Sequence, residues 1–547
     1  MIGSSLIKNI EASLKQNWDL PALSDYKGSI YHYKDIARRV AKLHILFEKC
    51  EIKKGDIIAV CGRNSAGWGT VFLASITYGA VVVPVLHEFK PDNIHNIINH
   101  SDAKILFVGD VVWESLNENF MPNLEAIILI NDYSILHSKR RELVKLRDSL
   151  NEHFGKKYPK NFRPEHVSFF EENPSDLALI NYTSGTTGFS KGVMLSYENL
   201  NNNMVFAEGV LGELRPGDSV VSMLPMAHMY GFSFEFMYEI LRGCHIQYLT
   251  RAPTPKVILD AFAETKPRLI IAVPLIIEKI YRKHLQPLLS KPFVKAILNL
   301  PVVDRRVMSK INEQLNKVFG DNFIEIIIGG AALSQEVEKF FKKIGFRYTV
   351  GYGMTECGPI ISYEDWKTTR LYSCGRTTVN MEIRIDSPDP MNVVGEVQVK
   401  GKNVMIGYYK NPEATAAAFT PDGWLKTGDL GLLDKDGYLF IKGRNKSLIL
   451  GPSGQNIYPE EIEDKINNTR YVSESLVVDV DGKLVALVYP DFGVLDEDKK
   501  DINEAMEEMR NTINGNLPSY SQITRVKVHP EEFEKTPKRS IKRFMYQ

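Results

Sequence analysis

Residues 323–353 read FIEIIIGGAALSQEVEKFFKKIGFRYTVGYG, and this stretch decides the fold class. An isoleucine-rich run is followed by two glycines, a polar segment and a second apolar run. Ser334 stands where a helix N-cap belongs. Apolar residues then recur at helical spacing, namely Val337, Phe340, Phe341 and Ile344. The stretch therefore predicts a strand, a glycine turn, a helix and a second strand.

The same alternation occurs earlier in the chain. The run IIAVCG (57–62) is followed by the helix-like WGTVFLASITYGA (68–80) and then by VVVPV (81–85). The segments KILFVGD (104–110) and AIILIND (126–132) are typical of buried strands. This order predicts an α/β fold of layered, mostly parallel sheets covered by helices.

The pattern changes near Arg444. The segments DKDGYLFIKG (434–443) and LVVDVDGKLVALVYP (476–490) each place Asp-Gly between strand-like runs, which indicates hairpins. In YPEEIEDKINN (458–468), Pro459 is suited to a first helical position. The charged run 496–510 is interpreted as the solvated face of a helix. We therefore expect a large domain over residues 1–445 and a small α+β domain over residues 446–547.

Charge and cysteine content restrict the partners. Lys plus Arg and Asp plus Glu are equal at 67 each, so no overall field attracts nucleic acid, and an anionic ligand needs local positive groups. The five cysteines are scattered without a C-x-x-C pair, which favours a reduced, cytoplasmic chain. The apolar run LIIAVPLII (269–277) is shorter than the roughly 20 residues of a membrane span. Peripheral contact with a membrane stays compatible with the sequence.

The stretch YTSGTTGFSKG (182–192) combines hydroxyls, glycines and one lysine. Free backbone amides and hydroxyls surround an anion well, and Lys191 adds a point charge, so a polyphosphate ligand is implied. A P-loop would have glycine where Ser190 stands and Ser or Thr where Gly192 stands, which weakens that interpretation. The alternative is a surface turn that binds nothing.

This stretch resembles the phosphate-binding signature of the adenylate-forming superfamily: acyl-CoA synthetases, luciferases of the firefly type and adenylation domains of peptide synthetases. The family usually has proline at the position of Ser190. GYGMTE (351–356), GWLKTGD (423–429) and GRNKSLILGPSGQNIYPEEIE (443–463) follow in the family's order and spacing. Weaker matches are YHYKDIARRVAKL (31–43) and PMAHMYG (225–231). The resemblance covers essentially the whole chain and is nearest to bacterial long-chain fatty acid–CoA ligases.

The resemblance implies a role for each motif. One group of residues would hold the β- and γ-phosphates of ATP: Thr183, Ser184, Gly185, Thr186, Thr187, Gly188 and Lys191. Another would surround the rest of the nucleotide and the start of the acyl channel: Gly330, Ala331, Ala332, Tyr352, Gly353, Thr355, Asp429 and Arg444. Within that group Tyr352 would stack on adenine, Thr355 would contact a phosphate oxygen, and Asp429 would accept both ribose hydroxyls.

Three further positions complete the implied site. Glu356 would hold Mg²⁺, which prefers one or two carboxylates together with phosphate oxygens. His228 would lie between the acyl and thiol channels, and Lys446 would be the hinge about which the small domain rotates. The alternatives are a packed core residue for His228 and Tyr352, a surface carboxylate for Glu356, and a turn-capping role for Asp429.

The sequence departs from the family at its end. In FEKTPKRSIKRF (533–544), Ser540 stands where relatives have the lysine that contacts the α-phosphate. Lys538 and Lys542 are the neighbouring cations, and in an extended segment both share a face with Ser540. We favour Lys538 as the replacement, which makes it a catalytic candidate beside Lys191, His228, Thr355 and Glu356.

The resemblance thus implies a ligase that activates a fatty, long-chain acid as acyl-AMP and transfers it to coenzyme A, using ATP and Mg²⁺. One alternative loads a carrier protein or takes a shorter or aromatic acid. Another is a nucleotide-binding regulatory protein that has lost turnover, for which Ser540 is the argument. The sequence gives no signal for the oligomeric state.

Overall fold

The computed structural model describes residues 2–183, 191–250, 253–282, 305–450, 455–535 and 541–546. Several candidate residues lie outside these ranges: Ser184, Gly185, Thr186, Thr187, Gly188, Lys538 and Ser540.

The largest described sheet has the strand order β20-β9-β8-β4-β3-β5-β6-β7. Its members are β3 (Ile57–Cys61), β4 (Val81–Val85), β5 (Ile105–Val108), β6 (Ala126–Leu129), β7 (Ile135–Ser138), β8 (Leu177–Thr183), β9 (Lys191–Ser196) and β20 (Gly407–Tyr408). Strands β8, β4, β3, β5 and β6 pair in parallel, whereas β7, β9 and β20 are antiparallel additions at the edges. Every residue of β3, β4 and β5 is buried, as expected for parallel strands covered on both faces.

Two smaller sheets complete the α/β layers. One has the order β10-β11-β1-β2, and the other has the order β12-β13-β14 with all pairs parallel. Their strands are β1 (Pro21–Asp25), β2 (Ile30–His32), β10 (Ser219–Ser222), β11 (His245–Tyr248), β12 (Ile270–Ala272), β13 (Ile326–Ile328) and β14 (Tyr348–Val350). The prediction of mostly parallel α/β layers is therefore confirmed for this part of the chain.

The predicted strand–helix–strand unit of residues 323–353 is present as β13, α15 (Gln335–Ile344) and β14. The four apolar residues expected on one face of α15 are all buried. Ser334 occupies the N-cap position, but its hydroxyl donates to Asn468 Oδ1 at 2.7 Å, a residue of the C-terminal part. The helix start was predictable from local sequence, whereas this tertiary hydrogen bond was not.

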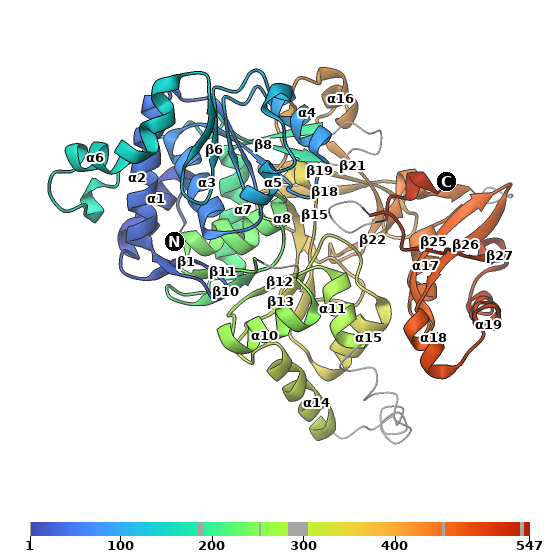
Figure 1. The fold of residues 1–547 in the computed structure, drawn as a ribbon. Helices are drawn as coiled ribbons and strands as arrows, with labels where there is room; N and C mark the ends of the chain where they lie inside the picture. Colours follow the sequence, from blue (N-terminus) through green and yellow to red (C-terminus); the bar gives the residue numbers. More distant parts are fainter. Residues whose placement is uncertain are drawn as a thin grey trace.

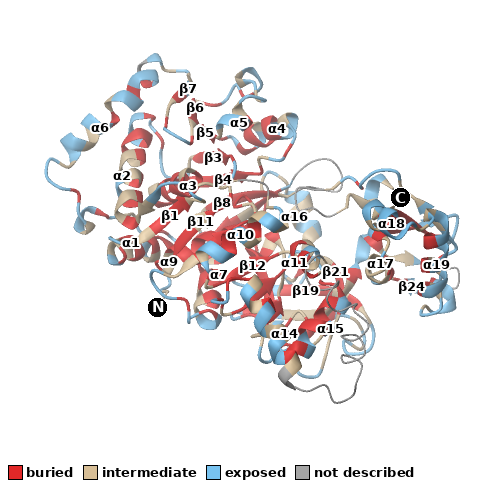
Figure 2. Cartoon of the chain, turned by 60° about the horizontal axis from the view of Figure 1, so that its bottom comes forward, coloured by how far each residue is buried: buried red, intermediate tan, exposed pale blue. Residues whose placement is uncertain are grey.

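Helices cover both sides of the sheets (Figure 1). They are α1 (Leu6–Gln16), α2 (Tyr33–Lys49), α3 (Ala66–Tyr78), α4 (Pro91–Ser101), α5 (Asp110–Trp113), α6 (Leu146–Lys157), α7 (Tyr197–Val210), α8 (Met229–Phe232), α9 (Tyr238–Leu241), α10 (Pro255–Thr265), α11 (Pro274–Ile280) and α14 (Arg305–Val318). Helix α3 is buried over nearly its whole length, and α6 projects from the edge of the molecule. Figure 2 shows that buried residues concentrate in the sheets and on the helix faces turned toward them.

Antiparallel sheets follow after residue 351. Their strands are β15 (Tyr352–Gly353), β16 (Ile360–Tyr363), β17 (Arg376–Thr377), β18 (Met381–Asp386), β19 (Gly395–Gly401), β21 (Leu425–Leu433) and β22 (Leu439–Arg444), and α16 spans Pro412–Ala418. Strands β21 and β22 form the hairpin expected around Asp436-Gly437. This hairpin carries two candidate site residues, Asp429 and Arg444.

The C-terminal part has its own hydrophobic core, formed by residues between Ile457 and Ile523. Its elements are β23 (Ile449–Leu450), β24 (Asn456–Ile457), α17 (Pro459–Asn467), β25 (Val472–Val480), β26 (Lys483–Pro490), α18 (Phe492–Asp498), α19 (Ile502–Asn514) and β27 (Arg525–Val528). The hairpin at Asp481-Gly482 and the helix starting at Pro459 are as predicted. The charged run 496–510 spans two helices rather than one, because Lys499 has a φ of 52° and ends α18.

The C-terminal part contacts Arg282, just after α11, and Ser334, the N-cap residue of α15. Besides the Ser334–Asn468 bond, the Arg282 guanidinium donates to the backbone oxygens of Asn467 and Val472. The boundary between residues 445 and 446 stays a prediction. In the ranges that the structure describes, no helix has both the length and the apolar character needed to cross a bilayer.

Candidate active site

The predicted phosphate-binding turn connects β8 to β9. Thr183 and Lys191 face each other as an antiparallel pair, so the two strands hold the ends of the turn together. Lys191 is exposed, and its ammonium lies 4.7 Å from the centre of the Tyr408 ring. The structure therefore presents the end of the turn, with its positive charge, at the surface.

The GYGMTE motif runs through β15 into a short 3-10 turn, Thr355–Cys357. Gly353 is required by close packing, because a Cβ at this position would lie 2.2 Å from the backbone oxygen of Pro359. Thr355 is 3% exposed, and its Oγ1 has no hydrogen-bond partner among the described residues. Glu356 is half-buried, and its Oε1 accepts a hydrogen bond from Tyr408 Oη at 2.9 Å.

Asp429 contacts two residues from other motifs, Tyr352 and Arg444. The Asp429 carboxylate is 5% exposed, and Tyr352 Oη donates to its Oδ2 at 2.6 Å. Arg444 Nε lies 3.0 Å from its Oδ1, because Asp429 and Arg444 are paired across β21 and β22. Burial and the neighbouring Asp429 carboxylate raise the pKa of Tyr352, so its hydroxyl stays protonated and acts as a donor.

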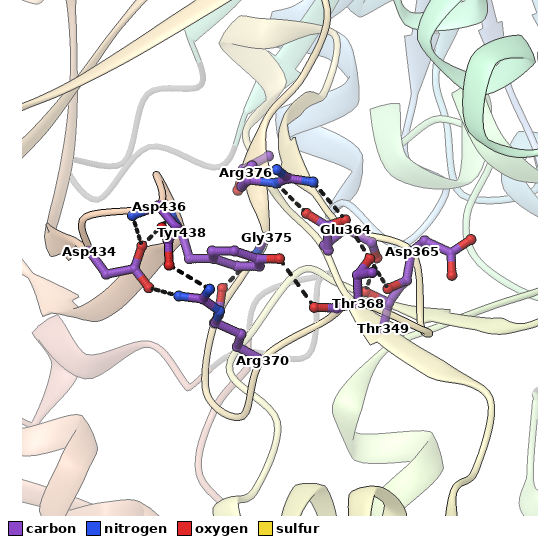
Figure 3. Close-up of polar contacts among 12 residues, drawn as sticks. Thr349, Glu364, Asp365, Thr368, Arg370, Gly375, Arg376, Asp434, Asp436 and Tyr438 are labelled. Carbon is purple, nitrogen blue, oxygen red and sulfur yellow. Dashed lines mark hydrogen bonds and ion pairs between the residues drawn. The ribbon is translucent and has the colours of Figure 1, made fainter.

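A polar cluster supports the turn of the β21–β22 hairpin (Figure 3). Arg370 contacts the carboxylates of Asp434 and Asp436, the latter at 2.7 Å, and its guanidinium lies 4.0 Å from the Tyr438 ring centre. Tyr438 Oη donates to the backbone oxygen of Thr368 at 3.2 Å. These contacts tie the far end of the hairpin to the segment between β16 and β17.

Asparagines of helix α7 hold the segment directly after the GYGMTE motif and the segment around Asn403. Asn203 donates to the backbone oxygen of Cys357 at 3.3 Å and accepts from the backbone N–H of Ile360 at 3.0 Å. Asn199 donates to the backbone oxygens of Lys402 and Val404. Sequence reasoning missed these residues. The available signal was the run NLNNN (199–203), because asparagine is unfavourable inside a helix unless its side chain has a specific partner.

His228 lies at the N-terminus of α8, where its Nδ1 accepts from the backbone N–H of Tyr230 at 3.2 Å. The segment before it is held by the buried Glu235, whose Oε2 accepts from the backbone N–H groups of Met223 and Leu224 at 3.0 and 2.8 Å. Burial raises the pKa of Glu235 despite these bonds. His228 itself is half-buried.

The GGAA segment adjoins the His228 segment through Tyr230. The Tyr230 hydroxyl donates to the backbone oxygen of Ile327 at 3.0 Å, and a Cβ at Gly329 would lie 3.0 Å from the Tyr230 ring. Gly330 has a φ of 84°, which favours glycine. Gly330, Ala331 and Ala332 are exposed, so the structure leaves the predicted adenine border accessible.

The two remaining candidate regions flank the C-terminal part. Lys446 is exposed in a 3-10 turn, Asn445–Ser447, directly after β22. Near the chain end, Lys535 and Ile541 form an antiparallel bridge. Lys542 is ion-paired with Glu534 at 2.9 Å. This ion pair engages one of the two cations considered near Ser540.

The donor set fits a magnesium ion held largely by phosphate oxygens. Among the residues that the structure describes, no group of three or more His, Cys, Asp or Glu side chains could hold a metal. Glu356 would supply one carboxylate, and Mg²⁺ commonly takes one or two carboxylates when a substrate polyphosphate provides other ligands.

The family model "AMP-binding enzyme" matches residues 10–409, and "AMP-binding enzyme C-terminal domain" matches residues 446–546. The chain belongs to the AMP-binding enzyme family, as the sequence motifs predicted.

Individual relatives are distant but extend over most of the chain. Long-chain-fatty-acid–CoA ligase 5 from Rattus norvegicus is 28% identical, over 92% of this chain and 79% of that protein. Probable 4-coumarate–CoA ligase 1 from Dictyostelium discoideum is 27% identical, over 81% and 77%. The structure of o-succinylbenzoate coenzyme A synthetase from Bacillus subtilis with ATP and magnesium ion has a TM-score of 0.74 at 21% identity and 98% coverage of both chains. The last comparison confirms the predicted fold.

Proposed function

We propose that this protein is an acid–thiol ligase that activates a fatty acid with ATP as acyl-AMP and then transfers the acyl group to coenzyme A. The observation that carries the proposal is that Tyr352 and Arg444 both contact the carboxylate of Asp429. These residues come from three sequence motifs and together offer the acceptors and donors that a ribose and its phosphate need.

The first half-reaction brings a carboxylate to the α-phosphate. The acid is already ionised at neutral pH, so no general base is needed, and the site has to align two anions and neutralise their charge. Lys191 and the turn before it would hold the β- and γ-phosphates, and the Thr355 hydroxyl would donate to a phosphate oxygen. Magnesium, when bound at Glu356, supplies positive charge to the phosphate oxygens.

In the proposed complex, the nucleotide changes the hydrogen-bond partners of Asp429. Both of its oxygens are engaged, by Tyr352 Oη and by Arg444 Nε. The two ribose hydroxyls would take these acceptor positions, which releases Tyr352 to stack on adenine and Arg444 to contact ribose and phosphate. The exchange keeps the buried carboxylate hydrogen-bonded before and after binding.

The second half-reaction needs a thiol at the same carbonyl carbon. Lys446 lies in the short turn after β22 and would be the hinge about which residues 446–547 rotate between the two half-reactions. His228 would border the passage between acid and thiol. Lys538 remains our candidate for the cation missing at Ser540, because Lys542 is occupied by Glu534.

A long aliphatic acid is the substrate class we favour. Support comes from the name of the rat relative, a long-chain-fatty-acid–CoA ligase. A second candidate is an aromatic acid, favoured by the 4-coumarate–CoA ligase among the relatives.

A pyrophosphate-release assay tests the proposal. Saturated acids of increasing length and a series of aromatic acids are each supplied with ATP and magnesium, with and without coenzyme A. Release with long-chain acids and formation of the thioester are expected. Release with aromatic acids alone would select the second candidate. Release without thioester would indicate a carrier protein, and no release with any acid would contradict ligase activity.

A further inference from the structure

Tyr408 lies between two charged candidate residues, Lys191 and Glu356, which are both distant from it in the sequence. It belongs to β20, which extends the main sheet beside β9, the strand that begins at Lys191. Backbone hydrogen bonds join Ile406 N–H to the oxygen of Met194 at 2.9 Å and Tyr409 N–H to that of Gly192 at 2.7 Å. The backbone of Tyr408 is therefore fixed in register with the strand that leaves the phosphate-binding turn.

The side chain of Tyr408 contacts both charges at once. Its hydroxyl donates to Glu356 Oε1 at 2.9 Å, and the Lys191 ammonium lies 4.7 Å from the centre of its ring. The residue is only 9% exposed. The backbone oxygen of Glu356 also accepts from Met405 N–H at 2.8 Å, so the same short segment holds Glu356 by both backbone and side chain.

The chemistry of each contact suits a fixed position. A tyrosine phenol is neutral near pH 7, so the Tyr408 hydroxyl has a proton to donate to Glu356. One carboxylate oxygen is thereby engaged, which limits rotation of the other. The ring face attracts the Lys191 ammonium, which keeps this long side chain near the end of the turn.

We propose that Tyr408 is a positioning residue of the metal–triphosphate site, its hydroxyl orienting Glu356 toward magnesium and its ring holding Lys191 toward the phosphates. The inference rests on the proposed function for its ligand, Mg·ATP, but not on which acid is activated. It adds to the site a residue that lies 52 positions from Glu356 in the sequence.

Binding measurements separate the two contacts. ATP affinity is measured by calorimetry without any acid, over a series of magnesium concentrations and in EDTA. Tyr408→Phe removes only the hydroxyl and is expected to raise the half-saturating magnesium concentration about fivefold, with little change in EDTA. Tyr408→Leu removes the ring as well and is expected to weaken ATP binding also in EDTA, about threefold. In a Glu356→Gln background, Tyr408→Phe should have no further effect on the magnesium dependence.

Tyr409→Phe is the matched control. It removes a hydroxyl from the next residue, where Tyr409 Oη donates to Asp102 Oδ2 at 3.2 Å, away from Glu356. This variant should bind Mg·ATP as the unaltered protein does, and thermal melting of all variants reports any loss of stability.

Unchanged magnesium dependence in Tyr408→Phe would overturn the inference. So would an equal shift in Tyr408→Phe and Tyr409→Phe, or an additive shift in the Glu356→Gln background. A protein that binds Mg·ATP with the expected Tyr408 effect but releases no pyrophosphate with any acid would support this inference and contradict the proposed function. Absence of Mg·ATP binding would contradict both.

Discussion

Replacement of Asp429 by alanine tests the ribose site. The carboxylate is 5% exposed and engaged at both oxygens, 2.6 Å from Tyr352 Oη and 3.0 Å from Arg444 Nε. A hydrogen bond to a charged group contributes about 1.5–3 kcal/mol, and two would form with a ribose diol. Because the ribose would replace the present contacts with Tyr352 and Arg444, only part of this would appear as affinity. We expect a loss of roughly 1–3 kcal/mol, which is about 5- to 150-fold in the ATP dissociation constant.

Calorimetry with two ligands distinguishes a ribose contact from general damage. Asp429→Ala should weaken ATP binding while leaving inorganic tripolyphosphate, which has no ribose, nearly unaffected. Asp436→Ala is the matched control, because Asp436 lies in the turn of the same hairpin and bonds to Arg370 at 2.7 Å. That variant should bind both ligands normally. Unchanged ATP affinity in Asp429→Ala would refute the ribose assignment, and an equal loss for both ligands would indicate a distorted hairpin instead.

Three further predictions follow from the geometry. Burial raises the pKa of Glu239 to about 8, and neither carboxylate oxygen has a partner among the described residues. The folded protein therefore favours the protonated form of Glu239. The stability that this protonation contributes is fully present below pH 4.5 and is lost as the pH rises through 8. Glu239→Gln should therefore raise the free energy of unfolding more at pH 8 than at pH 4.5, by a difference of roughly 2–5 kcal/mol. Urea titrations at the two pH values measure this difference, and an equal effect of the substitution at both would contradict the prediction. Lys446→Pro should block thioester formation while acyl-AMP formation continues, measured as separate half-reactions; joint failure would exclude the hinge role. Lys538→Ala should slow acyl-AMP formation at least tenfold and Lys542→Ala should not, because Lys542 pairs with Glu534; the reverse ranking in single-turnover assays would exclude Lys538.

Much of the fold was predictable because its signals are local. The unit 323–353 shows its strand, turn and helix in its own apolar periodicity, and the two Asp-Gly hairpins appear where their dipeptides stand. The charged run 496–510 was harder, since charge alone does not reveal that Lys499 adopts a left-handed conformation and separates two helices.

The candidate site was predictable only in part. Asp429, Tyr352 and Arg444 lie in contiguous motifs that carry their own pattern. Asn203, by contrast, contacts Ile360 across 157 positions in the sequence, and Ser334 contacts Asn468 across 134. Such partners are set by how distant segments pack, and a single sequence carries no periodicity that pairs them.

The most direct test of the central claim is a crystal structure of this protein with ATP and magnesium. The account predicts the triphosphate against the turn that ends at Lys191, magnesium at Glu356, and the ribose hydroxyls on Asp429 in place of Tyr352 and Arg444. A nucleotide bound elsewhere, with Tyr352 and Arg444 still on Asp429, would contradict it.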